Sequence, residues 1–302
     1  MRARSVRGNT GDEVRAFFRL SAVVAAALLP VAVASAANLD RQALEAFNHY
    51  TERARAQCAT HCTRSEFLKI DSSPAMESRV HDGEIVVTPV GHTPLKVPDG
   101  LIHDWIGTAF IPGITIQEVL AMVRDYGHYS EYYAPQVIQS QALRHADEDY
   151  HFRMLMMNQS LFSKSALEGE YAESFVRVDN QDWYSIASST SIRQVDHVGE
   201  PDETLLPDGE GSGYIWRLMS ISKFEQRDGG VYVQMEVIAL SRGIPASLRW
   251  IVDPIVRRVA RGSLETSLEK TRAAVNSTEA TARRTEPERT APPAVSLTSA
   301  WR

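Results

Sequence analysis

Few side chains in this sequence could act as an acid, a base or a nucleophile in an enclosed site. His103, in "GLIHDWIGTAF", is the best candidate for a general base, because imidazole exchanges protons near neutral pH. A hydrogen-bonded histidine at the surface or rim is the simpler interpretation. Ser220, Ser222 and Tyr150 offer hydroxyl groups, but no Ser-His-Asp order accompanies them. We therefore assign no catalytic residue and favour a protein that is not an enzyme.

The two cysteines, Cys58 and Cys62, stand four residues apart in "CATHC". In an oxidising compartment such a pair predicts a disulfide. On an ideal helix their Cβ atoms lie about 6 Å apart, beyond the usual disulfide separation of about 4 Å, so a bridge would tighten or end the helix. Free thiols and a metal site are the alternatives, and the spacing does not fit a c-type haem site.

Other signatures of cofactor or nucleic-acid binding are weak. The glycine-rich "DGEGSG" precedes a predicted strand and not a helix, so it indicates a loop and not a phosphate site. The formal net charge of −6 disfavours a nucleic-acid-binding protein, which normally carries a basic excess. We expect no cofactor, no metal and no nucleic-acid partner.

The elements that must position these residues follow a clear order. A helix is predicted over 39–57 and a short strand in "GEIVVTPV", followed by a strand in "PDGLIHDWIGTAFIPG". An amphipathic helix follows in "ITIQEVLAMVRDY", where Thr115 and Glu118 form a capping box. About six antiparallel strands come next, and a long helix over 244–275 comes last. The only element long enough to cover such a sheet is that final helix.

The hairpin around "RDGG" shows which side chains share a face. The turn residues are either Asp228-Gly229 or Gly229-Gly230, and both registers give the same two faces. The second register would place Lys223 opposite Glu236, a favourable pair. One face is apolar with two hydroxyl groups, and we assign it inward; His103 and Trp105 share a face of the earlier strand.

The predicted ligand-lining residues are apolar or carry a hydroxyl group, and they come from the inward strand faces and from the last helix. They are Trp105, Tyr150, Phe152, Met154, Met156, Trp216, Leu218, Ser220, Phe224, Val233, Met235, Val237, Leu248, Ile251 and Ile255. A core filled by these side chains is the alternative, since such stripes more often pack than line a site. The outward face is also apolar, with Met219 and Ile238 on it, so we expect the N-terminal helix with Leu44 and Phe47 to cover it.

The final helix contains Pro254, which would cost about 3 kcal/mol in an unbroken helix interior. We therefore predict two pieces: a first one or two turns over 245–252, and a second helix capped by Asp253 that runs to about Val275. Leu248, Ile251, Ile255, Val259, Leu264 and Leu268 should face the sheet, and the first piece could act as a lid.

Two long stretches of this sequence resemble the START-like superfamily, also called SRPBCC or helix-grip proteins. The first, "IQEVLAMVRDYGHYSEYYAPQVIQSQAL", looks like the family's first helix and the entry to its second strand. The second, "YIWRLMSISKFEQRDGGVYVQMEVIALSRGIPASLRWIV", looks like the last hairpin and the start of the C-terminal helix. The resemblance implies an α+β helix-grip fold: a curved antiparallel sheet of about six to seven strands wrapped on a long helix, with an apolar cavity between them. The helix at 39–57 is an addition to that fold.

The N-terminus has the three parts of a secretory signal peptide: five arginines, a short apolar run, and Ala34-Ser35-Ala36 as a cleavage pattern. An uncleaved anchor is the alternative. Removing five arginines and two acidic residues changes the net charge from −6 to −9. The predicted organisation is a signal peptide at 1–36, a helical extension at 37–98, a START-like domain at 99–275 and a disordered tail at 276–302.

These observations favour an exported carrier or sensor of an apolar small molecule, of the lipid or isoprenoid class, in the periplasm or outside the cell. A cyclase- or hydrolase-like enzyme using the same cavity and a partner-binding module with a filled core are the alternatives. Four arginines near the start of the last helix, Arg249, Arg257, Arg258 and Arg261, could meet anionic headgroups. A solvated helix face, with long side chains that cover apolar neighbours, is the commoner explanation. We expect a monomer.

Overall fold

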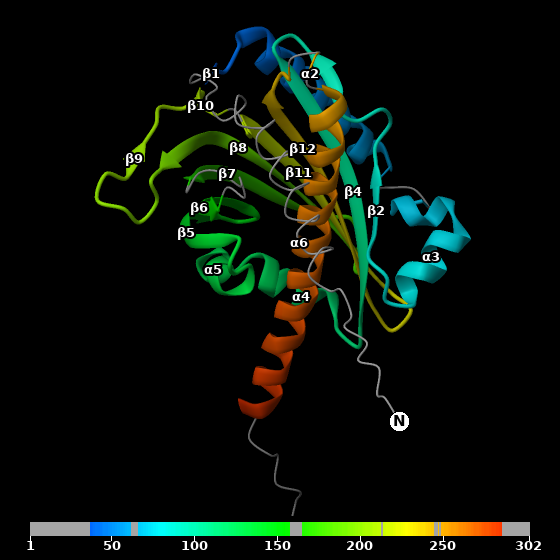
Figure 1. Cartoon of the computed structure of the whole chain (residues 1–302). Coiled ribbons are helices and arrows are strands. Elements are labelled where there is room, and N and C mark those ends of the chain that lie inside the picture. Colours follow the sequence, from blue (N-terminus) through cyan, green and yellow to red (C-terminus); the bar gives the residue numbers. More distant parts are fainter. Residues whose placement is uncertain are drawn as a thin grey trace, which may run out of the picture.

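The computed structural model describes residues 37–61, 66–157, 165–212, 214–244, 247 and 249–285. A strongly curved antiparallel sheet dominates it (Figure 1). The long strands are β4 (Gly100–Pro112), β5 (Val137–Ala146), β6 (Asp149–Met157), β7 (Ser165–Arg177), β8 (Asp182–Asp196), β11 (Arg217–Arg227) and β12 (Gly230–Arg242). The short strands are β1 (Ala37–Asn38), β2 (Val86–Pro89), β3 (Leu95–Val97), β9 (Thr204–Leu205) and β10 (Glu210–Gly211).

The strands of the main sheet are hydrogen-bonded in the order β2-β4-β12-β11-β8-β7-β6-β5, with β3 beside β4 and β9 beside β8. Strands β1 and β10 pair separately. The predicted antiparallel sheet is confirmed. Its seven long strands agree with the predicted six to seven, and the short strands β2, β3 and β9 add to them. The order also matches the helix-grip arrangement, because the first long strand, β4, pairs with the last, β12.

The hairpin between β11 and β12 turns on Asp228 and Gly229, which both have positive φ angles of 54° and 76°. A two-residue turn with two positive φ angles suits the right-handed twist of its strands. The register therefore pairs Phe224 with Val233 and Lys223 with Gln234, so the predicted pairing of Lys223 with Glu236 does not occur. The inward and outward faces are the same in both registers.

A long helix, α6 (Arg249–Thr285), crosses the concave face of the sheet (Figure 1). Its Leu264 and Leu268 are buried against β4, where Gly107 permits a close approach. A Cβ atom at Gly107 would lie 2.7 Å from Leu268 Cδ1. The prediction that the last helix lies on the concave face is thus confirmed for these two leucines.

The predicted break in this helix is wrong. Helix α6 is continuous through Pro254, and it runs past Val275 to Thr285. Pro254 lies close to the helix start and is exposed, so the lost hydrogen bond affects only one carbonyl in an exposed turn. Ile255 is 45% exposed and does not face the sheet, and Val259 is half-buried. Leu248 and the side chain of Ile251 lie outside the described residues.

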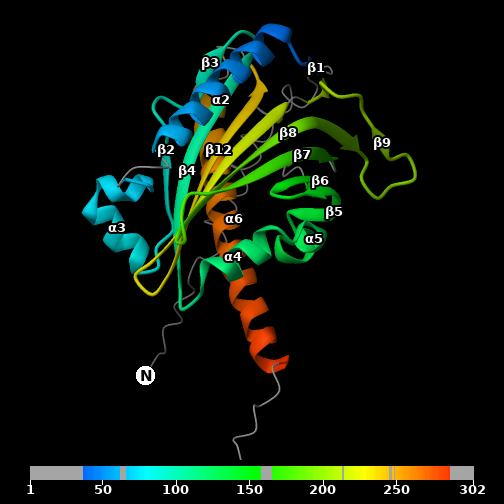
Figure 2. The same ribbon diagram turned by 180° about the vertical axis from the view of Figure 1, so that it is seen from behind.

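The convex, outer face of the sheet is covered by the N-terminal extension: α2 (Arg41–His61), the 3-10 helix η1 (Lys69–Ser72) and α3 (Pro74–His81) (Figure 2). Phe47 packs there with Met219 and Ile238, which confirms the predicted cover. Leu44 is only half-buried and lies outside this cluster.

One predicted inward residue belongs to this outer cluster instead. Trp216 packs with the buried side chains under α2. It precedes the first residue of β11, where the strict alternation of faces has not yet begun, and its backbone N–H donates to Leu240 at 2.7 Å.

Three short helical segments close the other end of the concave face: α4 (Ile116–Val123), the 3-10 helix η2 (Tyr126–His128) and α5 (Tyr129–Tyr132). The capping box is confirmed, because the Thr115 N–H donates to Glu118 Oε2 at 2.7 Å and the Glu118 N–H donates to Thr115 Oγ1 at 3.4 Å.

Several predictions concern residues outside the described part. The signal peptide at 1–36, residues 286–302 of the tail and Cys62 lie there, so the disulfide with the buried Cys58 stays a prediction. Among the helices of the described residues, none combines the length and the apolar character needed to cross a membrane.

Candidate functional site

The middle of the concave face is only partly covered. Five inward side chains of β11 and β12 are half-buried, and we call them the central strip: Leu218, Ser220, Met235, Val237 and Ala239. Helix α6 makes its main sheet contacts with β4, β2 and β12, at one side of this strip. Half-buried apolar side chains on an otherwise buried face retain solvent-accessible apolar surface, on which an apolar molecule gains free energy by binding.

One side of the strip is bordered by stacked aromatic rings. Phe152 lies between Tyr126 and Tyr171, with ring centroids 4.2 Å and 5.2 Å apart, and all three are buried. Gly169 makes room for this stack, because a Cβ atom there would overlap the Tyr171 ring. The predicted inward residues Met154 and Met156 pack against the same cluster and stay half-buried, as does Tyr150.

A carboxyl group accompanies these rings. Tyr126 Oη donates to Glu173 Oε2 at 2.8 Å, and Glu173 lies on β7 between the inward residues Tyr171 and Phe175. Burial raises the pKa of Glu173, while the nearby Ser185 hydroxyl, the hydrogen bond from Tyr126 and the charge of Arg124 partly oppose that rise. Glu173 can therefore hold or accept a proton more readily than an exposed glutamate.

The sequence interpretation missed Glu173, because it found no acidic residue on the inward faces it assigned. It left the face of residues 165–177 unassigned. Alternate residues of a strand share a face, so Glu173 lies on the same face as Tyr171, two positions before it, and Phe175, two positions after it. This spacing is the sequence feature that could have identified Glu173.

Arg124, just after α4, anchors the neighbouring aromatic residues. Its guanidinium lies 4.5 Å from the Phe175 ring centroid and 5.0 Å from that of Trp183. It also forms an ion pair with Glu148. Two cation–π contacts and one ion pair thus hold the Arg124 side chain. Arg124 in turn positions the end of the site that α4 forms.

His103 lies at the other side of the strip. Its Nε2 is 2.9 Å from Ser241 Oγ, and both residues point inward from neighbouring strands. His103 is 7% exposed, so it is a hydrogen-bonded histidine but not a surface one. Its face partner Trp105 is buried in the core beneath α6, which settles that both residues face inward.

The predicted lining residues thus fall into four groups. The following are half-buried on the concave face: Tyr150, Met154, Met156, Leu218, Ser220, Met235 and Val237. The following are buried in its core: Trp105, Phe152, Phe224 and Val233. Trp216 and Ile255 point elsewhere, and Leu248 and the side chain of Ile251 lie outside the described residues.

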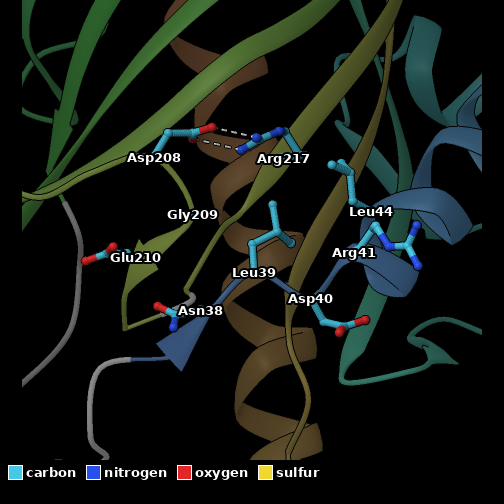
Figure 3. A pocket seen from close by; sticks show the side chains of 9 residues that line it. All are labelled: Asn38, Leu39, Asp40, Arg41, Leu44, Asp208, Gly209, Glu210 and Arg217. Carbon is cyan, nitrogen blue, oxygen red and sulfur yellow. Dashed lines mark hydrogen bonds and ion pairs between the residues drawn. The ribbon is translucent and has the colours of Figure 1, made fainter.

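A second hollow, of about 350 Å³, lies away from the concave face, where β1, the start of α2 and β11 meet (Figure 3). Arg217 borders it, but both terminal nitrogens of Arg217 donate to Asp208, at 3.0 Å and 2.7 Å. Asp40 Oδ1 accepts the N–H groups of Gln42 and Ala43 and so caps α2. Because these polar groups satisfy one another, we do not assign the ligand site there.

Comparison with known proteins gives structural similarity only. No family model matches the sequence, and no curated protein matches it. A STAR-related lipid transfer protein (fragment 25-204) from Xanthomonas axonopodis is similar at 14% identity and a TM-score of 0.43, over 63% of this chain and 98% of that chain. Human STARD10 is similar at 9% identity and 0.41, over 70% and 82%.

The Zhui aromatase/cyclase of Streptomyces sp. R1128 is similar at 12% identity and a TM-score of 0.36, over 61% of this chain and 94% of that chain. The strand order and the position of α6 agree with the helix-grip arrangement that the sequence resemblance predicted.

Proposed function

We propose that this protein is a carrier or sensor that binds an apolar small molecule, of the lipid or isoprenoid class, on the concave face of its sheet. The observation that carries the proposal is the half-buried central strip. The apolar outward residues of the same two strands, such as Met219, Ile221 and Ile238, are buried, whereas the apolar residues of the central strip keep exposed surface. Methionines at its border, such as Met154, suit ligands of variable shape.

The proposal includes export. Residues 1–36 carry the pattern of a secretory signal peptide, and the remaining chain has a calculated charge of −9. A carrier of this kind would work as a monomer in the periplasm or outside the cell. Expression of the full chain with an alkaline phosphatase fusion at its C-terminus tests this: activity outside the cytoplasm supports export, and activity lost without residues 1–36 confirms the leader.

Membrane contact is a further part of the proposal. Trp250 is 78% exposed at the start of α6, and Arg257, Arg258 and Arg261 are exposed on the turns that follow. An exposed tryptophan with arginines suits a bilayer surface with anionic lipid. Exchanging Arg257 and Arg258 for glutamate should lower cosedimentation with phosphatidylglycerol vesicles several-fold; unchanged binding would remove the membrane contact.

Native mass spectrometry of the purified protein, followed by solvent extraction, tests the central proposal. We expect a co-purifying apolar compound. Val237→Trp, which fills the strip, should abolish that mass, whereas Leu143→Trp, at an exposed position of the edge strand β5, should not. A wild-type protein that carries no apolar compound and binds none added would contradict the proposal.

A further inference from the structure

Strand register places two polar groups on opposite sides of the central strip. One row of directly paired residues crosses the concave face from β7 to β4: Glu173, Ala187, Ser220, Val237 and Trp105. The residues in the middle of the row, Ala187, Ser220 and Val237, have small, uncharged side chains. Its two ends border the polar groups described above.

At the β7 end, the Glu173 carboxyl accepts a hydrogen bond from Tyr126 and has Ser185 beside it. A carboxyl group offers more acceptor sites than one tyrosine uses. The nearby cation, Arg124, is already paired with Glu148. An anionic ligand group would therefore meet an acidic residue, whereas a hydroxyl group could donate to Glu173.

At the β4 end, His103 stands two residues from Trp105 on the same face. It pairs across the sheet with Ala239, a small member of the central strip, and it hydrogen-bonds Ser241. The His103 imidazole and the Ser241 hydroxyl thus border the central strip next to Ala239. Because Ala239 is small, no bulky β12 side chain separates them from the strip.

The distance between the two polar groups sets the length that a ligand needs in order to contact both. Four strand spacings of about 4.8 Å put the Glu173 and Trp105 backbones about 19 Å apart along the sheet. His103 lies about 7 Å further along β4. The direct path across the concave side is shorter than this path along the curved sheet, and an extended chain or fused-ring compound suits it better than a compact molecule.

We infer that the ligand is an elongated apolar molecule with an uncharged hydrogen-bonding group, such as a hydroxyl, at each end. One group binds at Glu173 and Tyr126, and the other at His103 and Ser241. This inference rests on the proposed function, and it adds that the ligand is polar at both ends.

Calorimetric titration of delipidated protein with three probes of equal chain length tests the inference. The probes are hexadecane-α,ω-diol, hexadecanol and hexadecane, each delivered from cyclodextrin. The diol should bind about tenfold more tightly than the monoalcohol, because one additional buried hydrogen bond contributes about that factor. Glu173→Leu and His103→Leu should each remove this preference, while the conservative Glu173→Gln should retain it. Unfolding midpoints of the variants monitor their folding.

The possible outcomes separate the two claims. Equal affinity for diol and monoalcohol in the wild type, with both abolished by Val237→Trp, would overturn the two-ended ligand and leave the carrier intact. Failure of all three probes to bind the wild type would contradict the proposed function itself. The wild-type comparison decides the inference even where a variant does not fold.

Discussion

On the outer face of the sheet, the N-terminal extension buries Met219, Ile221 and Ile238 almost completely. On the concave face of the same strands, Leu218, Ser220 and Val237 remain half-buried beside α6. These residues are immediate neighbours along the chain and differ only in the direction of their side chains. The contrast indicates that the outer face serves stability. The concave face keeps solvent-accessible apolar surface, which a role in stability alone does not explain.

The polar groups of the two faces differ as well. On the outer face, Tyr50 Oη donates to Asp104 at 2.7 Å, and Lys223 donates to the Phe67 carbonyl at 2.8 Å, so polar groups hold the extension against the sheet. On the concave face, Glu173 and His103 border the central strip instead. The following predictions test this division, from the largest expected effect to the smallest.

Truncating adjacent residues of β11 should separate the two faces. Met219→Ala, on the filled outer face, should lower the free energy of unfolding by about 3 kcal/mol, because it leaves a cavity among buried side chains. Leu218→Ala, next to it on the concave face, should cost about 1 kcal/mol, since its side chain is already partly solvated. Urea unfolding measures both. Equal losses would show that both faces are packed core.

Gly107 tests how α6 is seated. Gly107→Val should lower the free energy of unfolding by about 2 kcal/mol, because its side chain would collide with Leu264 and Leu268. Gly262→Ala provides the control: nothing lies within 4 Å of that position on α6, so it should stabilise by up to about 1 kcal/mol. A Gly107→Val protein as stable as the wild type would contradict the close packing of α6 on β4.

The buried acids of the outer face predict a pH dependence. Burial and the neighbouring Glu236 raise the pKa of Asp104 to about 7, with the Tyr50 hydrogen bond opposing. Because the folded state holds this proton more tightly than the unfolded chain, the stabilisation is complete below about pH 4 and is lost as pH rises through about 7.

Asp104→Asn should therefore gain stability relative to the wild type as pH rises from about 4 to about 8. Denaturant midpoints at several pH values measure this difference. Asp147→Asn, at an exposed turn between β5 and β6, should follow the wild type throughout. If the Asp104→Asn and wild-type curves run parallel, burial of this carboxyl does not control the seating of α2.

Local chemistry made much of the fold predictable. The Asp228-Gly229 turn, the Thr115 capping box and the alternation along β11 and β12 are set by neighbouring residues, so the sequence indicated the hairpin, the helix start and the two faces. The apolar outer residues even predicted their cover, because such a face must be buried.

The features that the sequence did not reveal depend on the ends of strands and helices and on contacts between residues that are far apart in the chain. Trp216 turned outward because it lies just before β11 begins, where the strand alternation does not yet apply. Pro254 did not break α6 because one lost hydrogen bond near an exposed helix start costs less than in a helix interior. The pairing of Glu173 with Tyr126 joins residues from β7 and η2, which no local pattern brings together.

Oxidation of the methionines by dilute hydrogen peroxide, mapped by peptide mass spectrometry, tests the central claim most directly. Met235 and Met154 are half-buried on the concave face, whereas Met219 is buried on the outer face. In the delipidated protein, Met235 and Met154 should oxidise well before Met219, and an added apolar ligand should protect them but leave the exposed Met157 unprotected. Uniformly slow oxidation of Met235, Met154 and Met219, or no protection by any apolar ligand, would contradict a binding surface on the concave face.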